Sequence, residues 1–221
     1  ATLVPLLLIL GSTQMIAAFK RSYQFEHVFK SAFCIGLLPM LYAPALPLVL
    51  IVPVTLVLYR RTLREAVVAA AGLLLPFFIC SVVWWWLGDS FGLMGHELLA
   101  GTTLGEDTAL PAFFGEKGVW SKVYIGLFAA LTLCSAIIIL RTLSSLRTRA
   151  KKIHIHFLWL LLLCLISLLL PGNTIASLGV LAVPCCVTVS AFFIRYRGWL
   201  PLAIYTVLTA LMLYINLFPG V

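Results

Sequence analysis

Apolar residues dominate seven stretches of the chain, and shorter polar or charged segments separate them. Each stretch is close to or longer than about 20 residues, the length that an α-helix needs to cross a bilayer. A helix also satisfies its backbone hydrogen bonds internally, as lipid requires. The pattern predicts an all-α, polytopic transmembrane helix bundle that forms one integral-membrane domain over residues 1–221, with about seven spans at 2–19, 31–59, 66–87, 123–140, 153–170, 174–194 and 199–218.

The second stretch, 31–59, predicts a kinked or broken helix because it contains Pro39, Pro44, Pro47 and Pro53. Each proline removes a backbone donor and clashes with the preceding turn. Broken helices line the transport sites of some membrane proteins. No charged residue accompanies this break, so we interpret it as a packing feature.

Three local patterns predict helix starts and contacts. Thr62 followed by Glu65 matches a capping box and predicts a helix that begins near Leu63. Gly72, later in that helix, favours close contact with another helix. The polar notch at 12–14 is expected to face other helices rather than lipid.

Charge is distributed unevenly between the connecting segments. Residues 88–122 form an expected exterior loop with five of the seven acidic residues. The connectors after the second, fourth and sixth spans carry ten of the fifteen basic residues, which places them and the start of the chain in the cytoplasm. Lys20, Arg21 and Lys30 oppose this assignment. The two main cytoplasmic basic clusters are Arg60, Arg61, Arg64, Arg141, Arg147, Arg149, Lys151 and Lys152.

The composition excludes several classes of protein. The chain is 63% hydrophobic and 10% charged, whereas soluble domains have about 45–50% and about 25%. This excludes a soluble enzyme, a disordered tail and a secreted disulfide scaffold. The net charge of +8 lies in connectors that meet lipid headgroups. We therefore expect the lipid bilayer and other integral membrane proteins as partners, and no nucleic acid.

Two groups of residues are candidates for chemistry at the exterior side. Glu106, Asp107 and Glu116 could act as a general base or bind a divalent cation during transfer on a lipid-linked substrate. The alternative is that these acids only solvate the loop. Trp84, Trp85 and Trp86 are expected to be interfacial anchors, or alternatively the floor of a sugar or lipid site.

No metal site or other cofactor is predicted. The sequence from His96 to Ala100 begins like HExxH, but alanine replaces the second histidine. Residues 91–99 are instead expected to form a short interfacial helix. His154 and His156 point in different directions on a helix and lie beside a basic cluster, so a headgroup or partner contact is expected.

The apolar stretches are poor in reactive groups. Their cysteines form no CxxC pair, and packing is their expected role: Cys34, Cys80, Cys134, Cys164, Cys185 and Cys186. No acidic or basic residue lies in the middle of a span, which disfavours an ion-coupled transporter or a pump. Nucleotide-binding and hydrolase motifs are also absent from the sequence.

Several motifs resemble a Bacteroidota family of polytopic inner-membrane proteins whose function is unknown. The resemblance rests on segments 33–44, 60–65 and 72–77, with Val183-Pro184 and Phe192-Phe193 in the same pattern, and covers nearly the whole chain. Arg64 stands where members usually have tryptophan, and Met40-Leu41 also departs from the pattern. The resemblance implies a multi-pass protein of the bacterial inner (cytoplasmic) membrane and a further N-terminal segment, and it supplies no catalytic residue.

Small-residue helix faces, spans without charges and the lack of a catalytic motif predict a non-enzymatic protein. We expect a structural or accessory subunit of a membrane assembly in envelope biogenesis or protein export. One alternative is an enzyme that acts on a lipid-linked substrate at loop 88–122. A transporter or channel that uses the broken second helix is a third hypothesis.

Overall fold

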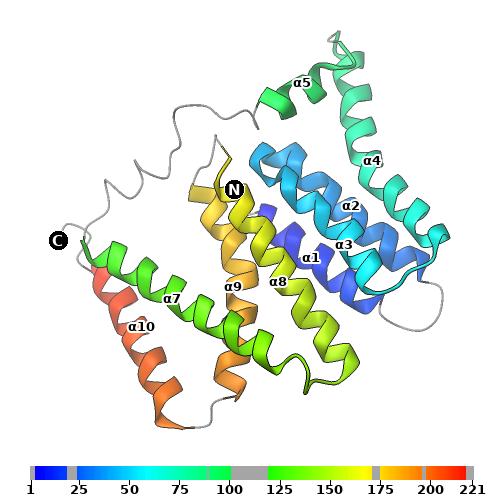
Figure 1. Ribbon diagram of the computed structural model, residues 1–221. Coiled ribbons are helices and arrows are strands. Elements are labelled where there is room, and N and C mark those ends of the chain that lie inside the picture. The colour runs from blue at the N-terminus through cyan, green and yellow to red at the C-terminus, as the bar shows by residue number, and fades with distance from the viewer. Residues whose placement is uncertain are drawn as a thin grey trace.

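The computed structural model describes residues 3–18, 24–88, 90–100, 119–170, 175–195 and 198–217 (Figure 1). Helices make up 89% of these residues, and none of them is in a strand. The predicted all-α class is therefore confirmed for this part of the chain. The helices are α1 Leu3–Ala17, α2 Phe25–Leu41, the 3-10 helix η1 Ala43–Leu50, α3 Ile51–Leu58, α4 Leu63–Trp86, α5 Leu93–Ala100, α7 Val119–Thr142, α8 Thr148–Leu168, α9 Ile175–Arg195 and α10 Trp199–Leu217.

Four of the described helices are long and apolar enough to cross a membrane: α4, α7, α8 and α9. Only 22% to 39% of their most apolar segments is buried against other helices. The outward-facing remainder is apolar, as a lipid-facing surface would be. Helix α1 and the continuous segment η1–α3 are shorter, with 15 and 16 residues.

The segment expected as one kinked span, 31–59, instead folds back on itself. Tyr42 adopts an extended conformation (φ −156°, ψ 96°) between α2 and η1. Pro44 and Pro47 cannot donate to the preceding turn, so an α-helix cannot continue through them. Segment η1–α3 then returns beside α2 (Figure 1). The break was predicted correctly, but the direction of the chain after it was not.

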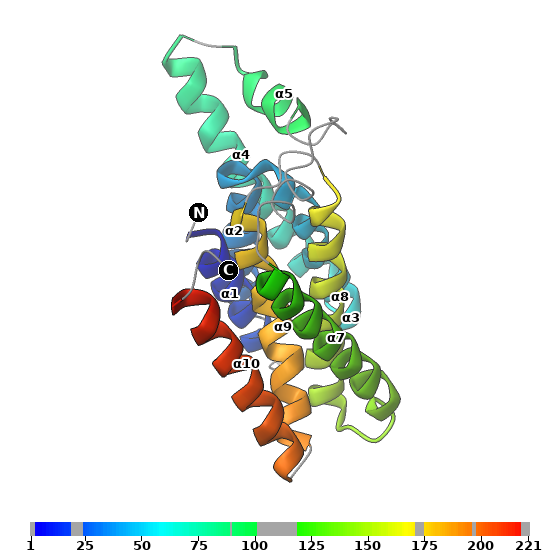
Figure 2. The ribbon, with the colours of Figure 1, turned by 90° about the vertical axis from the view of Figure 1, so that its left-hand side faces the viewer.

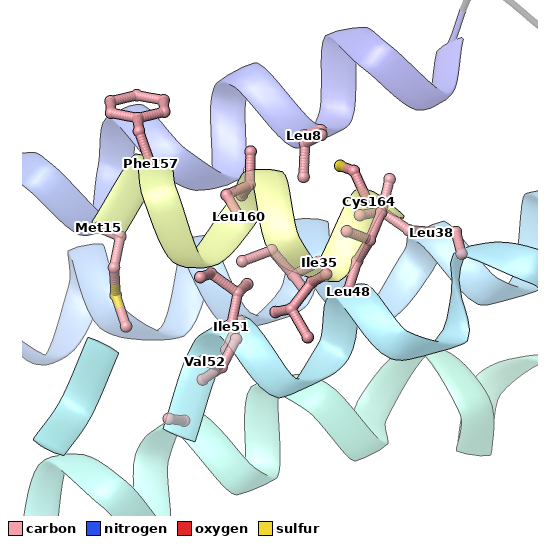
Figure 3. Packing of buried hydrophobic residues seen from close by; sticks show 14 of the residues in the cluster. Leu8, Met15, Ile35, Leu38, Leu48, Ile51, Val52, Phe157, Leu160 and Cys164 are labelled. Carbon is pink, nitrogen blue, oxygen red and sulfur yellow. The ribbon is translucent and has the colours of Figure 1, made fainter. Parts of the chain in front are cut away.

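The main core lies where α2 and η1–α3 meet α1, α8 and α9. Figure 3 shows Ile35 of α2 close to Leu48 and Ile51 of η1–α3, with Leu160 of α8 beside them. All four side chains are fully buried. The core therefore depends on the reversal at Tyr42, because a straight helix would separate Ile35 from Ile51 by about 24 Å.

Polar groups of α1 face α2, as expected of the notch at 12–14. The Ser31 hydroxyl donates to the Gly11 carbonyl oxygen over 2.7 Å. The His27 ring nitrogen Nδ1 lies 2.7 Å from the Gln14 side-chain oxygen. Ser12 is buried, whereas Thr13 is exposed and bonds within its own helix. The expectation is confirmed for two of the three notch residues.

Helices α2 and α4 approach each other at two glycines. A methyl group added to Gly36 would lie 2.7 Å from the Leu73 carbonyl oxygen. One added to Gly72 would lie 2.9 Å from the Phe29 carbonyl oxygen. Both distances are too short for real side-chain contacts, so only glycine fits. The close contact predicted at Gly72 is confirmed.

Helices α7, α9 and α10 form a second contact region on the far side of the molecule from α4 (Figures 1 and 2). Leu131 of α7 packs with Val189 and Phe192 of α9. The Trp120 and Tyr214 rings meet edge-on, with centroids 5.7 Å apart, and join α7 to α10. This region buries fewer side chains than the main core.

Substituting Gly72→Ala is expected to lower the free energy of unfolding by about 1–3 kcal/mol, because the methyl group overpacks the α2–α4 crossing. Gly126→Ala is the matched control, since no described residue lies within 4 Å of its added methyl group. The control should be neutral or stabilising by up to about 1 kcal/mol. Unfolding of the purified protein in detergent, followed by circular dichroism, measures both. Equal effects of the two substitutions on the free energy of unfolding would contradict the close α2–α4 contact at Gly72.

Candidate functional site

The two predicted basic clusters lie at the same end of the helix bundle. The Ser167 hydroxyl near the end of α8 donates to the Pro44 carbonyl oxygen at the start of η1. Helix α8 also contacts α3, so α8 and η1–α3 are antiparallel and the start of α8 lies near the end of α3 (Figure 1). The α3–α4 turn with Arg60, Arg61 and Arg64 thus shares this end with the α7–α8 connector (Figure 1). We call it the basic end.

The basic end holds a buried ion pair between Arg61 and Glu65. Arg61 Nη1 lies 3.0 Å from Glu65 Oε1, and Glu65 is only 2% exposed. The same carboxylate accepts from the Thr62 backbone N–H, while the Thr62 hydroxyl accepts from the Glu65 N–H. This confirms the capping box and the helix start at Leu63. The i,i+4 spacing of Arg61 and Glu65 indicates the pair, but the sequence interpretation assigned Arg61 only to a cytoplasmic basic cluster.

His156 does not contact headgroups, contrary to the sequence expectation. It is 0% exposed and packs edge-on against Phe157, with ring centroids 5.4 Å apart. Neither of its ring nitrogens has a hydrogen-bond partner among the described residues. His156 lies on the same face of α8 as Leu160, Leu163 and Ser167. This face is directed toward η1–α3, where the Ser167 hydroxyl bonds the Pro44 carbonyl oxygen. His154, two residues earlier, is half-buried.

Tyr59 follows α3 at the basic end and is also buried. Burial raises the pKa of its phenol to about 12, with a smaller opposing effect from the Arg61 charge. The phenol therefore stays protonated at physiological pH. Buried polar groups at this end are thus neutral or paired, and they stabilise helix positions rather than offer a free acid or base.

The end opposite the basic end carries the tryptophan cluster. Trp86 is 86% exposed and Trp85 is also exposed at the end of α4, as interfacial anchoring requires. Helix α5 confirms the short helix expected at 91–99 and packs on α4. The Phe91 and Phe78 rings meet edge-on, with centroids 6.2 Å apart.

The predicted acidic candidates Glu106, Asp107 and Glu116 lie outside the described residues. Within the described ranges, no group of three His, Cys, Asp or Glu residues is placed to hold a metal ion. Cys185 is buried and its neighbour Cys186 is exposed, so the two side chains point apart. The described residues therefore bring no predicted catalytic group together.

Comparison of the chain with protein-family models, curated proteins and solved structures found no match. The function must therefore be argued from the chain's own residues.

Glu65→Gln is expected to lower the free energy of unfolding by about 2 kcal/mol, because it removes a buried charge–charge hydrogen bond and leaves the helix cap possible. Glu26→Gln is the matched control, since Glu26 forms an exposed i,i+4 pair with Lys30. Solvent screens such pairs, so no resolvable change is expected. Unfolding of the Glu65→Gln and Glu26→Gln variants in detergent measures the two changes. Equal losses in the free energy of unfolding would contradict a stabilising role for the burial of the Arg61–Glu65 pair.

Proposed function

We propose that the chain is a multi-pass protein of the bacterial inner membrane with eight passes: α1, α2, η1–α3, α4, α7, α8, α9 and α10. The reversal at Tyr42 adds one pass to the seven expected from hydropathy. It also removes the charge conflict at Lys30, which lies in the first turns of α2 and so falls on the same side as the other basic connectors. The basic end is then cytoplasmic by the positive-inside rule, and the Bacteroidota resemblance agrees with an inner-membrane location.

The short segments α1 and η1–α3 are compatible with crossing. Helix α1 spans about 22 Å, less than the roughly 30 Å of a typical hydrocarbon core. Thinning of the bilayer accommodates short segments at a modest cost. Their burial against longer helices α8 and α9 also reduces their contact with lipid.

The eight passes can be tested by labelling single cysteines introduced after the six native ones are replaced. Lys30→Cys and Arg64→Cys should both react with a membrane-impermeant maleimide from the cytoplasmic side only. Ser90→Cys, near the end of α4, should react only from the exterior. Labelling of Lys30→Cys from the exterior would contradict the eight passes and support the seven-pass arrangement.

We further propose that the protein is a non-enzymatic subunit of a membrane assembly in envelope biogenesis or protein export. The observation that carries this proposal is an unoccupied small-residue face on α7. Gly126, Ala130 and Cys134 recur every four residues, and all three are exposed. No atom of the described residues lies within 4 Å of a methyl group added at Gly126.

Elsewhere in this bundle, glycines on helix faces mark helix contacts. Gly11, Gly36 and Gly72 each lie against a neighbouring helix. Helices associate in lipid where small residues let their backbones approach closely. The α7 face has the same pattern, and none of the described helices occupies it at Gly126, so a helix from a partner subunit would fit there.

An enzyme that acts on a lipid-linked substrate at loop 88–122 is our second candidate. The exposed Trp85 and Trp86 favour it, because aromatic faces beside an acidic loop suit sugar or lipid binding. The proposed roles of Glu106, Asp107 and Glu116 belong to this candidate.

The subunit role can be tested by copurification in mild detergent. Gly126→Ile with Ala130→Ile should reduce the recovery of a stoichiometric partner at least about tenfold, because the bulky groups block close approach. Ala71→Ile, at an exposed alanine of α4, is the matched control and should retain the partner. Membrane levels of both variants should equal those of the natural chain. Full recovery with the α7 variant, or a natural chain that purifies alone, would argue against the role.

A further inference from the structure

A groove of about 360 Å³ lies between the end of α7 and the outward face of α8. Its volume falls in the range of small-molecule and lipid-chain sites, about 300–1,000 Å³. Its walls are almost entirely apolar. Leu140 and Leu143 come from the α7 side, and Ile155, Leu158, Trp159 and Leu162 come from α8.

Basic side chains continue the groove wall toward the basic end. One face of α8 carries Lys151, Ile155, Leu158 and Leu162, which follow one another at helical spacings of three or four residues. Arg147 is the N-cap residue just before the helix begins. Helical side chains lean toward the N-terminus, which carries the Lys151 ammonium away from the groove and toward the membrane surface. Arg147 and Lys151 are both exposed.

Among the described residues, no carboxylate forms an ion pair with Arg147 or Lys151. Residues 117–221 contain no aspartate or glutamate at all. At the basic end, Glu65 is paired with Arg61 and Glu26 with Lys30. Arg141, which follows Leu140 at the end of α7, adds a third exposed positive charge beside the groove. An anion from outside the chain would therefore complement these charges.

We propose that the α7–α8 groove binds an anionic phospholipid of the cytoplasmic leaflet. An acyl chain would occupy the apolar part against Leu158, Trp159 and Leu162. The headgroup phosphate would meet Arg147 and Lys151 at the membrane surface. Apolar walls alone would accept any lipid chain, whereas the basic mouth selects negative headgroups. This inference rests on the proposed membrane insertion, but not on the proposed subunit role.

The test uses the full chain, purified in detergent and incubated with equimolar phosphatidylglycerol and phosphatidylcholine of identical acyl chains. Native mass spectrometry then counts the bound lipids. The natural chain should prefer phosphatidylglycerol about tenfold, and Arg147→Gln with Lys151→Gln should bring this ratio close to one. The matched control, Arg64→Gln with Arg195→Gln, removes the same charge from the same end and should keep the preference.

A second variant distinguishes lipid binding in the groove from a general attraction of anionic lipids to the basic surface. Ile155→Trp fills the groove without a change of charge, and it should reduce phosphatidylglycerol binding about as much as the double charge variant. Unchanged binding in Ile155→Trp, equal losses in both double variants, or no preference in the natural chain would each overturn the proposal. Displacement of phosphatidylglycerol by a lower concentration of a polyprenyl phosphate would overturn the phospholipid assignment. Cysteine labelling tests membrane insertion independently of these results.

Discussion

The close approach of α2 to α1 on one side and to α4 on the other determines how the rest of the bundle can be arranged. Lipid tails are as apolar as leucine, so helices in a membrane gain little from the hydrophobic effect and associate through packing and hydrogen bonds. Both are present at α2. Gly36 and Gly72 let the α2 and α4 backbones approach, and the Ser31 hydroxyl bonds the Gly11 carbonyl of α1. With both of these sides covered, η1–α3 packs against the remaining side of α2, where it builds the main core.

The reversal after α2 leaves backbone carbonyl groups without hydrogen-bond donors, and α8 supplies a donor for one of them. A 3-10 segment with two prolines leaves carbonyl groups without donors in their own helix, which lipid does not tolerate. The Ser167 hydroxyl donates to the Pro44 carbonyl at the start of this segment. Leu160 of α8 is fully buried in the same core as Leu48 and Ile51. Irregular backbone is thus covered by protein, and the position of α8 follows from the geometry of η1.

Sequence reasoning predicted features that depend on local chemistry and missed those that depend on which helix lies opposite. The capping box at Thr62 and the helix class follow from near neighbours in the chain. The residues around Tyr42 include no charged side chain and no glycine cluster. Two short apolar helices therefore look like one long span in the hydropathy pattern. His156 shows the same limit: its place beside basic residues suggested headgroups, yet the packing of α8 within the bundle buries it completely.

The charge pattern of the chain makes its C-terminal half more dependent on its surroundings than its N-terminal half. In the N-terminal half, the acidic residues of the basic end each pair with a nearby basic residue, and α2 packs closely on both neighbours. From residue 117 onward there are basic residues but no acids, and the contacts of α7 with α9 and α10 bury few side chains. Helix α7 therefore combines a small-residue face that none of the described helices covers at Gly126 with a groove whose basic mouth forms no ion pair with a described carboxylate. A partner helix on the first and an anionic lipid at the second would supply the contacts that this half of the chain does not make within itself.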